Sequence, residues 1–283
     1  MKYSARSLAR PLLENADKKL IKSKGEVNRL KILVCVKQVP DTTEIKIDPV
    51  TNTLIRNGVP SIVNPFDGYA LEAAARIKDK HPDTRIIVLS MGPEQAKNAL
   101  KECLGIAADK AYLISGRAFG GSDTLATSYI LSCAIKKVAE LEGGFDAIFC
   151  GKQAIDGDTA QVGPEIAEHL TDDGLTILKE CEDANQKIAV SLPCLVTFTK
   201  PSFDPRYPTI KRKLAANRAE IPVLGEDAFP DIDKTRIGLK GSPTHVKKSF
   251  VPPRKQGGVM IKEESNTASA QKLVAMLSEA HLI

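Results

Sequence analysis

The chain has 283 residues, of which 42% are hydrophobic and 27% charged, a composition typical of a globular domain. No apolar run approaches the roughly 20 residues that a membrane-spanning helix needs, so we expect no transmembrane segment. The formal charge of +5 is carried entirely by residues 1–29, which hold eight Lys/Arg and three Asp/Glu. The rest of the chain is neutral, which argues against nucleic acid as a partner, because phosphate backbones are bound by clustered positive charge.

We interpret the first 29 residues as an extension, disordered or weakly helical. Their Arg- and Ser-bearing start is similar to an organelle presequence, but Glu14, Asp17 and Glu26 are atypical of one. We therefore expect a cytoplasmic protein, and a mitochondrial matrix protein only if this extension is a presequence.

The six cysteines and four histidines show no metal-binding or iron–sulfur spacing. Buried free thiols in a reducing compartment explain the cysteines, and we expect no metal site. Any redox function would then depend on an organic cofactor.

Apolar runs alternate with helical patterns between residues 30 and 170. Strands are predicted at 30–36, 85–89, 111–114 and 145–150, and helices at 67–80, 92–104, 124–141 and around 166–170. We expect Gly105 to end the second of these helices. Because the strands are almost continuously apolar, they indicate an α/β fold with a doubly wound, mostly parallel sheet that is covered on both faces.

The pattern changes after Leu170. Residues 175–179 and 187–190 are predicted to form a hairpin, 193–199 a strand and 211–220 a basic helix. From residue 223 onward Pro, Gly and charged residues dominate, and only 268–282 has helical periodicity. We interpret 30–222 as the α/β domain and 223–283 as an extended C-terminal arm that wraps a partner subunit, because the arm lacks the apolar content to fold alone.

Four loops follow the carboxyl ends of predicted strands, at 37–40, 90–92, 120–124 and 151–163. A doubly wound sheet brings such loops to one edge, where ligands bind. Their hydroxyls, carboxylates and helix-start amides suit ribose and pyrophosphate groups. No histidine lies in these loops, so a nucleophile–base pair is not supported and we expect no catalytic residue. For 151–163 the alternative is a plain capped loop, since Asp158 and Gln161 stand at capping-box spacing.

Several motifs together resemble the beta subunit of electron transfer flavoprotein. They are LKILVCVKQVP at 30–40, VNPFD at 63–67, SMGP at 90–93, GGSDTLAT at 120–127, GKQAIDGDTAQVG at 151–163, LPCLVT at 192–197 and PRYP at 205–208. The resemblance runs in one order from about residue 30 to 261. One departure is that this chain is roughly a dozen residues shorter than the family pattern just after Leu170.

The resemblance implies an adenine-nucleotide-binding type of α/β fold and a heterodimer with an alpha subunit that carries FAD. Ordinary members hold AMP in the beta subunit, whereas flavin-bifurcating members hold a second FAD there and oxidise NADH. The form of residues 156–163 resembles the bifurcating group. That group implies ferredoxin or flavodoxin and an acyl-CoA dehydrogenase-type protein as partners. The alternatives are an AMP-binding, non-bifurcating electron carrier and a non-redox adenine-nucleotide-binding module.

The resemblance also implies the site. Gly157 and Ala160 would leave room for the larger cofactor, and Asn64 and Asp67 would face its adenosine end. The residues expected to bind the cofactor are Val36, Lys37, Asn64, Asp67, Ser90, Gly92, Gly121, Ser122, Asp123, Thr124, Thr127, Gln153, Asp156, Gly157, Asp158, Thr159, Ala160, Gln161 and Val162. Tyr207 and Ile210 are expected to dock a partner dehydrogenase, with a plain amphipathic helix start as the alternative.

Overall fold

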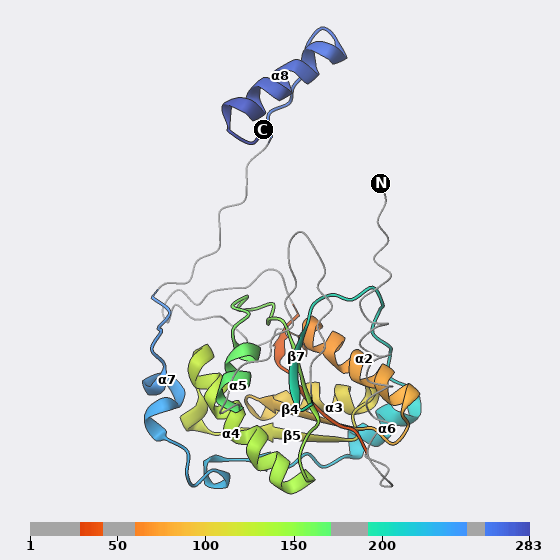
Figure 1. Ribbon diagram of the computed structural model, residues 1–283, viewed down its shortest axis with the longest axis vertical. Coiled ribbons are helices and arrows are strands. Elements are labelled where there is room, and N and C mark those ends of the chain that lie inside the picture. The colour runs from red at the N-terminus through yellow and green to blue at the C-terminus, as the bar shows by residue number, and fades with distance from the viewer. Residues whose placement is uncertain (1–28, 42–59, 171–191, 248–257) are drawn as a thin grey trace. The chain divides into compact units, whose positions relative to one another are not determined.

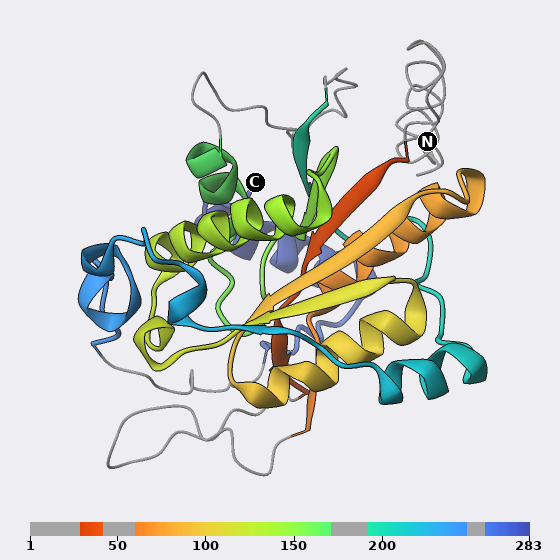
Figure 2. The same ribbon diagram turned by 90° about the horizontal axis from the view of Figure 1, so that it is seen from below.

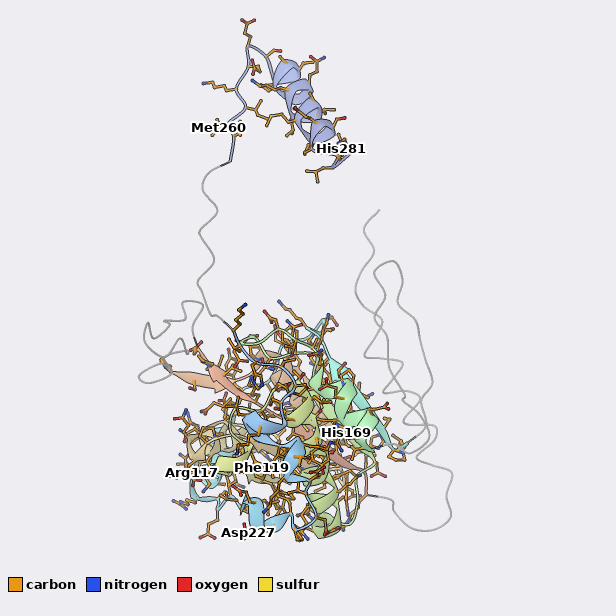
Figure 3. The ribbon with its side chains drawn as sticks, turned by 90° about the vertical axis from the view of Figure 1, so that its left-hand side faces the viewer. Arg117, Phe119, His169, Asp227, Met260 and His281 are labelled. Atoms are coloured by element: carbon orange, nitrogen blue, oxygen red, sulfur yellow. The ribbon has the colours of Figure 1, made fainter. Side chains whose placement is uncertain are left out.

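The computed structural model describes residues 29–41, 60–170, 192–247 and 258–283. The chain divides into two compact units, and we describe each by itself. The smaller unit contains Met260, His281 and helix α8 (Asn266–Glu279), which begins where the Ser265 hydroxyl accepts a 3.1 Å bond from Ala268 N (Figure 3). The described residues up to Lys247 belong to the larger unit.

The larger unit contains a sheet of six parallel strands in the order β7-β6-β1-β4-β5-β8 (Figure 1). The strands are β1 (Lys31–Cys35), β4 (Arg85–Met91), β5 (Lys110–Ile114), β6 (Ala147–Gly151), β7 (Cys194–Phe198) and β8 (Val223–Leu224). Two further strands, β2 (Gln38–Pro40) and β3 (Ser61–Val63), form a separate antiparallel pair. The fold is therefore α/β, as the sequence predicts.

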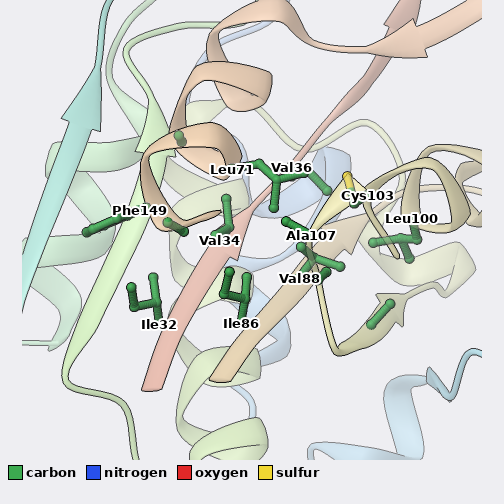
Figure 4. Close-up of a cluster of buried hydrophobic side chains, with 14 of the residues drawn as sticks. Ile32, Val34, Val36, Leu71, Ile86, Val88, Leu100, Cys103, Ala107 and Phe149 are labelled. Atoms are coloured by element: carbon green, nitrogen blue, oxygen red, sulfur yellow. The ribbon is translucent and has the colours of Figure 1, made fainter. Parts of the chain in front are cut away.

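Helices cover both faces of the sheet (Figure 2). They are α2 (Pro65–Lys80), α3 (Lys97–Ile106), α4 (Thr124–Glu142), α5 (Val162–Leu170), α6 (Ile210–Arg218) and the short α7 (Gly238–Gly241). One buried cluster joins Ile32, Val34, Ile86 and Val88 to α2 and α3 (Figure 4). The next residues along the same strands belong to a second cluster with α4 and α5. This alternation explains why the strands are apolar without interruption.

Helix starts and ends follow local chemistry with one exception. Pro65 occupies the first turn of α2, where its missing N–H costs nothing. Gly105, predicted to end a helix, instead lies inside α3, which continues to Ile106. A Cβ at Gly105 would lie 3.4 Å from Pro208 Cβ, so the glycine admits a close approach by the segment before α6.

The C-terminal boundary also differs from the prediction. Strand β8 pairs with β5 inside the main sheet, and the residues up to Lys247 belong to the larger unit. The C-terminal arm that wraps a partner subunit stays a prediction. The predicted extension at 1–28, the hairpin within 175–190 and the shortened stretch after Leu170 lie outside the described residues.

The strand order places a topological switch point between β1 and β6. From β1 the chain proceeds through β4 and β5 to one side of the sheet, and then through β6 and β7 on the other. Parallel doubly wound sheets bind ligands in the crevice outside the carboxyl ends of the two strands at this point.

Candidate functional site

Asp67 joins the two strand ends at the switch point. Its Oδ2 accepts a 2.8 Å bond from the backbone N–H of Lys37, just after β1, and its Oδ1 accepts a 3.0 Å bond from Gly151 N, at the end of β6. Gly151 has to be a glycine, because a Cβ there would lie 2.7 Å from Phe66 Cβ. One carboxylate in the first turn of α2 thus fixes the spacing of both loops.

Burial raises the pKa of Asp67 to about 7, although the bonds from Lys37, Asn64 and Gly151 lower it in part. The side chain lies within a first helical turn, where a negative charge is favoured. The carboxyl group therefore titrates close to neutral pH.

Asn64 holds the loop after β6 from the other side. Its side-chain amide donates a 2.8 Å bond to the carbonyl of Gln153, and its Oδ1 accepts a 3.2 Å bond from Ile155 N. Asn64 is fully buried. The side chains of Asn64 and Asp67, which were expected to face adenosine, are therefore occupied in shaping the loop.

The loop itself, residues 151–161, is exposed and conformationally unusual. Gln153 Nε2 donates a 2.7 Å bond to Asp158 Oδ1, and Lys37 Nζ forms an ion pair with Asp156 at 2.7 Å. Asp158 and Ala160 adopt left-handed backbone conformations, with φ of 52° and 54°. Such conformations are uncommon in residues with a side chain, and they gather at ligand-binding sites.

Gly157 is explained differently from Gly151. Apart from its two chain neighbours, no heavy atom of the described residues lies within 4 Å of the position of its missing Cβ, and its φ is outside the left-handed region. The packing of the chain therefore does not require a glycine at 157.

Helix α5 begins at Val162, so the residue next to its first turn is Gln161 and the predicted cap at Asp158 is wrong. Gln161 Oε1 instead accepts a 3.1 Å bond from the hydroxyl of Thr124, the first residue of α4. The two helix starts that the sequence assigned to phosphate binding are thus joined by one bond. The amide groups of a helix's first turn lack intrahelical acceptors and attract anions.

The start of α4 is engaged by the chain itself. Asp123 caps the helix by accepting from Ala126 N at 3.0 Å, and its other oxygen accepts from the Thr244 N–H and hydroxyl at 3.0 and 2.8 Å. Asp123 N donates to Ser242 Oγ at 2.8 Å, and Ser122 Oγ accepts from Gly238 N at 3.1 Å. The side chains of Ser122 and Asp123 therefore hold residues 238–244, and the sequence did not predict this role.

The other expected residues have the following positions. Ser90 is buried at the carboxyl end of β4, and its hydroxyl has no hydrogen-bond partner in the part of the chain that the structure describes. Val36 is buried beside it, bonded to Leu89 O at 2.8 Å. Thr127 lies in the first turn of α4, Gly92 follows β4, Gly121 precedes the α4 cap with φ of 75°, and Thr159 is exposed in the loop. The Ser90 hydroxyl is a buried group that a ligand could satisfy.

Tyr207 and Ile210, the expected docking residues, are 91% and 81% exposed. Large apolar side chains on a surface are informative when they gather, and Leu214 on the following turn of α6 is also exposed. Among the described residues no helix has the length and apolar character to span a membrane.

The fold and these loops define a doubly wound α/β protein with a candidate ligand site at its switch point. Residues 51–228 match the model of the electron transfer flavoprotein domain family. The chain is 50% identical over 267 residues to the electron transfer flavoprotein subunit beta of Megasphaera elsdenii, covering 87% of this chain and 98% of that protein.

It is also 46% identical to the caffeyl-CoA reductase-Etf complex subunit CarD of Acetobacterium woodii, covering 90% of this chain and all of CarD. Identity to protein FixA of Azorhizobium caulinodans is 40%, over 86% of this chain and 92% of FixA. The chain belongs to the electron transfer flavoprotein family, as a beta subunit.

Proposed function

We propose that this beta subunit binds FAD at the switch point together with an alpha subunit and accepts hydride from NADH. One electron then goes to ferredoxin or flavodoxin, and the other goes through the FAD of the alpha subunit to an acyl-CoA dehydrogenase-type protein. The proposed compartment is the cytoplasm.

The observation that carries this proposal is the loop at 151–161. It is largely exposed, it contains two left-handed residues with side chains, and its Gly157 is not required by any contact with the described residues. A glycine of this kind fits a site where a large ligand approaches the backbone. The buried hydroxyl of Ser90, at the carboxyl end of a neighbouring strand, adds a polar group that a ligand could satisfy.

The donor groups fit a dinucleotide. The first-turn amides of α5 suit the pyrophosphate, and the hydroxyls of Thr159 and Ser90 suit ribose or base edges. Asn64, Asp67 and Lys37 would orient the loop rather than react, since all three bond to the chain. When bound, the flavin supplies the hydride acceptor and the electron carrier, so that the protein needs no acid or base for that step.

The alternative within the family is a beta subunit that holds AMP and carries single electrons. A second alternative, from another class, is an adenine-nucleotide-binding module without redox activity. The similarity to CarD, a subunit of a caffeyl-CoA reductase-Etf complex, favours an electron-transfer role over the module without redox activity.

Cofactor extraction from the heterodimer, co-expressed with the alpha subunit of the same genome, tests the proposal. Two FAD and no AMP per heterodimer is the expected result, together with NADH-dependent flavin bleaching. One FAD with one AMP would establish the AMP-binding carrier of single electrons. A stable beta subunit without any flavin-containing partner would favour the adenine-nucleotide-binding module without redox activity.

A further inference from the structure

The segment 203–214 turns two arginines inward and three large apolar side chains outward. Tyr207, Ile210 and Leu214 are 91%, 81% and 55% exposed, whereas Arg206 and Arg212 turn toward the body of the larger unit and bond to it. Soluble surfaces ordinarily show the reverse pattern. An inverted pattern has to be held in place by specific bonds, because solvent alone would favour burying the apolar groups.

Arg206 supplies the first set of bonds. Its guanidinium donates to Glu72 at 2.8 and 3.2 Å and to Asp79 at 3.0 and 2.6 Å, and its backbone N–H donates to Glu72 Oε2 at 3.1 Å. Planar guanidinium groups that bridge two carboxylates fix direction as well as distance. The residue immediately before Tyr207 is therefore locked onto α2.

The carboxylate that receives Arg206 is itself enclosed. The Glu72 side chain is only 3% exposed, and it also accepts a 2.9 Å bond from Arg76. Burial alone would raise the pKa of Glu72, but the bonds from Arg206 and Arg76 hold it below its usual value. The Arg76 guanidinium also lies 3.9 Å from the centre of the Phe203 ring, which fixes the start of the segment.

A second anchor holds the other end. The Arg212 guanidinium donates to the carbonyls of Leu104 and Ala108, at 3.0 and 2.7 Å, and so closes the carboxyl end of α3. The apolar residue Ile210 therefore stands between two arginines that are each fastened to a different helix.

We propose that Arg206 and Arg212 are positioning residues that hold Tyr207, Ile210 and Leu214 as a preformed apolar row for an electron-transfer partner whose pocket is rimmed by carboxylates. The inference rests on the proposed function and adds the chemistry of the partner. The basic side chains of Lys211, Lys213 and Arg218 are exposed on the same helix. A row that is already ordered avoids part of the entropy cost of binding, and its basic rim speeds encounter with an acidic surface.

The test uses the flavin-loaded heterodimer and a purified short-chain acyl-CoA dehydrogenase as the partner. Electron transfer is measured against partner concentration, with flavin content and thermal unfolding recorded for each variant. Arg206→Ala and Arg206→Lys test the anchor. Asp79→Ala removes the more exposed of the two carboxylates that Arg206 contacts, since Asp79 is 59% exposed, and it leaves Arg206 paired with Glu72. Arg117→Ala is the control for the loss of an exposed arginine elsewhere.

We expect Arg206→Ala to raise the KM for the partner roughly tenfold while kcat and flavin content stay near wild type, because free energy is lost from docking alone. Arg206→Lys should recover part of the loss, Asp79→Ala should give a smaller rise, and Arg117→Ala none. Amide exchange in 203–214 should quicken in the same order, and KM should rise with salt.

Two results would overturn the inference. One is a KM that stays unchanged in Arg206→Ala and Asp79→Ala while Ile210→Ala raises it, since the row would then dock without its anchors. The other is a KM that does not depend on salt, which would show that the partner's pocket is not rimmed by carboxylates. If Ile210→Ala itself has no effect on KM, the dehydrogenase does not dock at this segment and the inference fails. The proposed function fails separately, if NADH does not bleach the flavin of the wild-type heterodimer.

Discussion

Lys37 and Asp156 form an ion pair across the switch point, with Lys37 Nζ 2.7 Å from Asp156 Oδ1 and 2.9 Å from Oδ2. The lysine follows β1 and the aspartate lies in the loop after β6, 119 residues later. The pair therefore links the two loops that flank the ligand crevice, on the exposed side of the Asp67 bonds.

The first prediction concerns this pair. Lys37→Ala should lower stability by about 1–3 kcal/mol, because it leaves the Asp156 carboxylate, whose side chain is only 8% exposed, without its cation. It should weaken cofactor binding several-fold, because the loop loses one of its fixed points. Lys137→Ala, which breaks a surface pair with Glu140 on α4, is the matched control and should leave flavin affinity unchanged. Fluorescence titration of FAD and chemical denaturation separate the two effects.

The second prediction contrasts two glycines. Gly157→Asp should leave the unfolding temperature of the heterodimer unchanged, because its Cβ would contact none of the described residues, but should lower FAD content through added bulk and charge. Gly151→Ala should instead destabilise the fold by about 1–3 kcal/mol, since its Cβ would press on Phe66. Unchanged flavin stoichiometry in Gly157→Asp would refute the placement of the cofactor at this loop.

The third prediction concerns pH. The pKa of Asp67 is raised from 3.8 to about 7 in the folded protein, so between these values the native state binds more protons than the unfolded state. The stability that this group contributes is present below about pH 4 and is lost as the pH rises through 7. Denaturant midpoints of the wild type and Asp67→Asn should be measured from pH 4 to 8. As the pH rises, the wild-type midpoint should fall relative to that of Asp67→Asn. Parallel curves would show that Asp67 does not titrate there.

The fourth prediction concerns Ser90. A buried hydroxyl without a partner costs about 1–3 kcal/mol, so Ser90→Ala should leave the apoprotein as stable or more stable. If the hydroxyl bonds the cofactor, the same change should weaken FAD binding about fivefold, which corresponds to about 1 kcal/mol. Calorimetry with and without FAD gives both quantities, and a loss of stability without cofactor would contradict the assignment.

The fifth prediction concerns the start of α4. Asp123→Ala should destabilise the larger unit by about 1–2 kcal/mol through loss of the helix cap. Because Asp123 also holds Thr244, amide exchange in 238–244 should accelerate in the variant. Ser242→Ala, which keeps the cap, should accelerate exchange there with a smaller loss of stability. Protection that is identical in all three proteins would show that these bonds do not hold the segment.

Much of the fold could be predicted because it depends on local chemistry. The uninterrupted apolar runs at 30–36 and 85–89 indicate strands buried on both faces, and both are central strands of the sheet. The loops after β1 and β6 were expected at one edge, and the Asp67 bonds join them there. Gly105 was predicted to end α3, but the helix continues to Ile106, and Arg212, more than 100 residues away, bonds the carbonyls of Leu104 and Ala108 there.

The sequence by itself determined the order of strands and helices, the family and the loops that surround the switch point. It could do so because the spacing of apolar residues, the positions of Gly and Pro and the short motifs are all local properties. Only the tertiary structure decided what each polar side chain in those loops does. Asp123 was expected to meet a cofactor, but Thr244, 121 residues away, occupies its carboxylate. Arg206 was a turn residue in sequence and became an anchor because α2 presents Glu72 and Asp79 to it. Partners so distant are fixed by packing, and no local pattern encodes them.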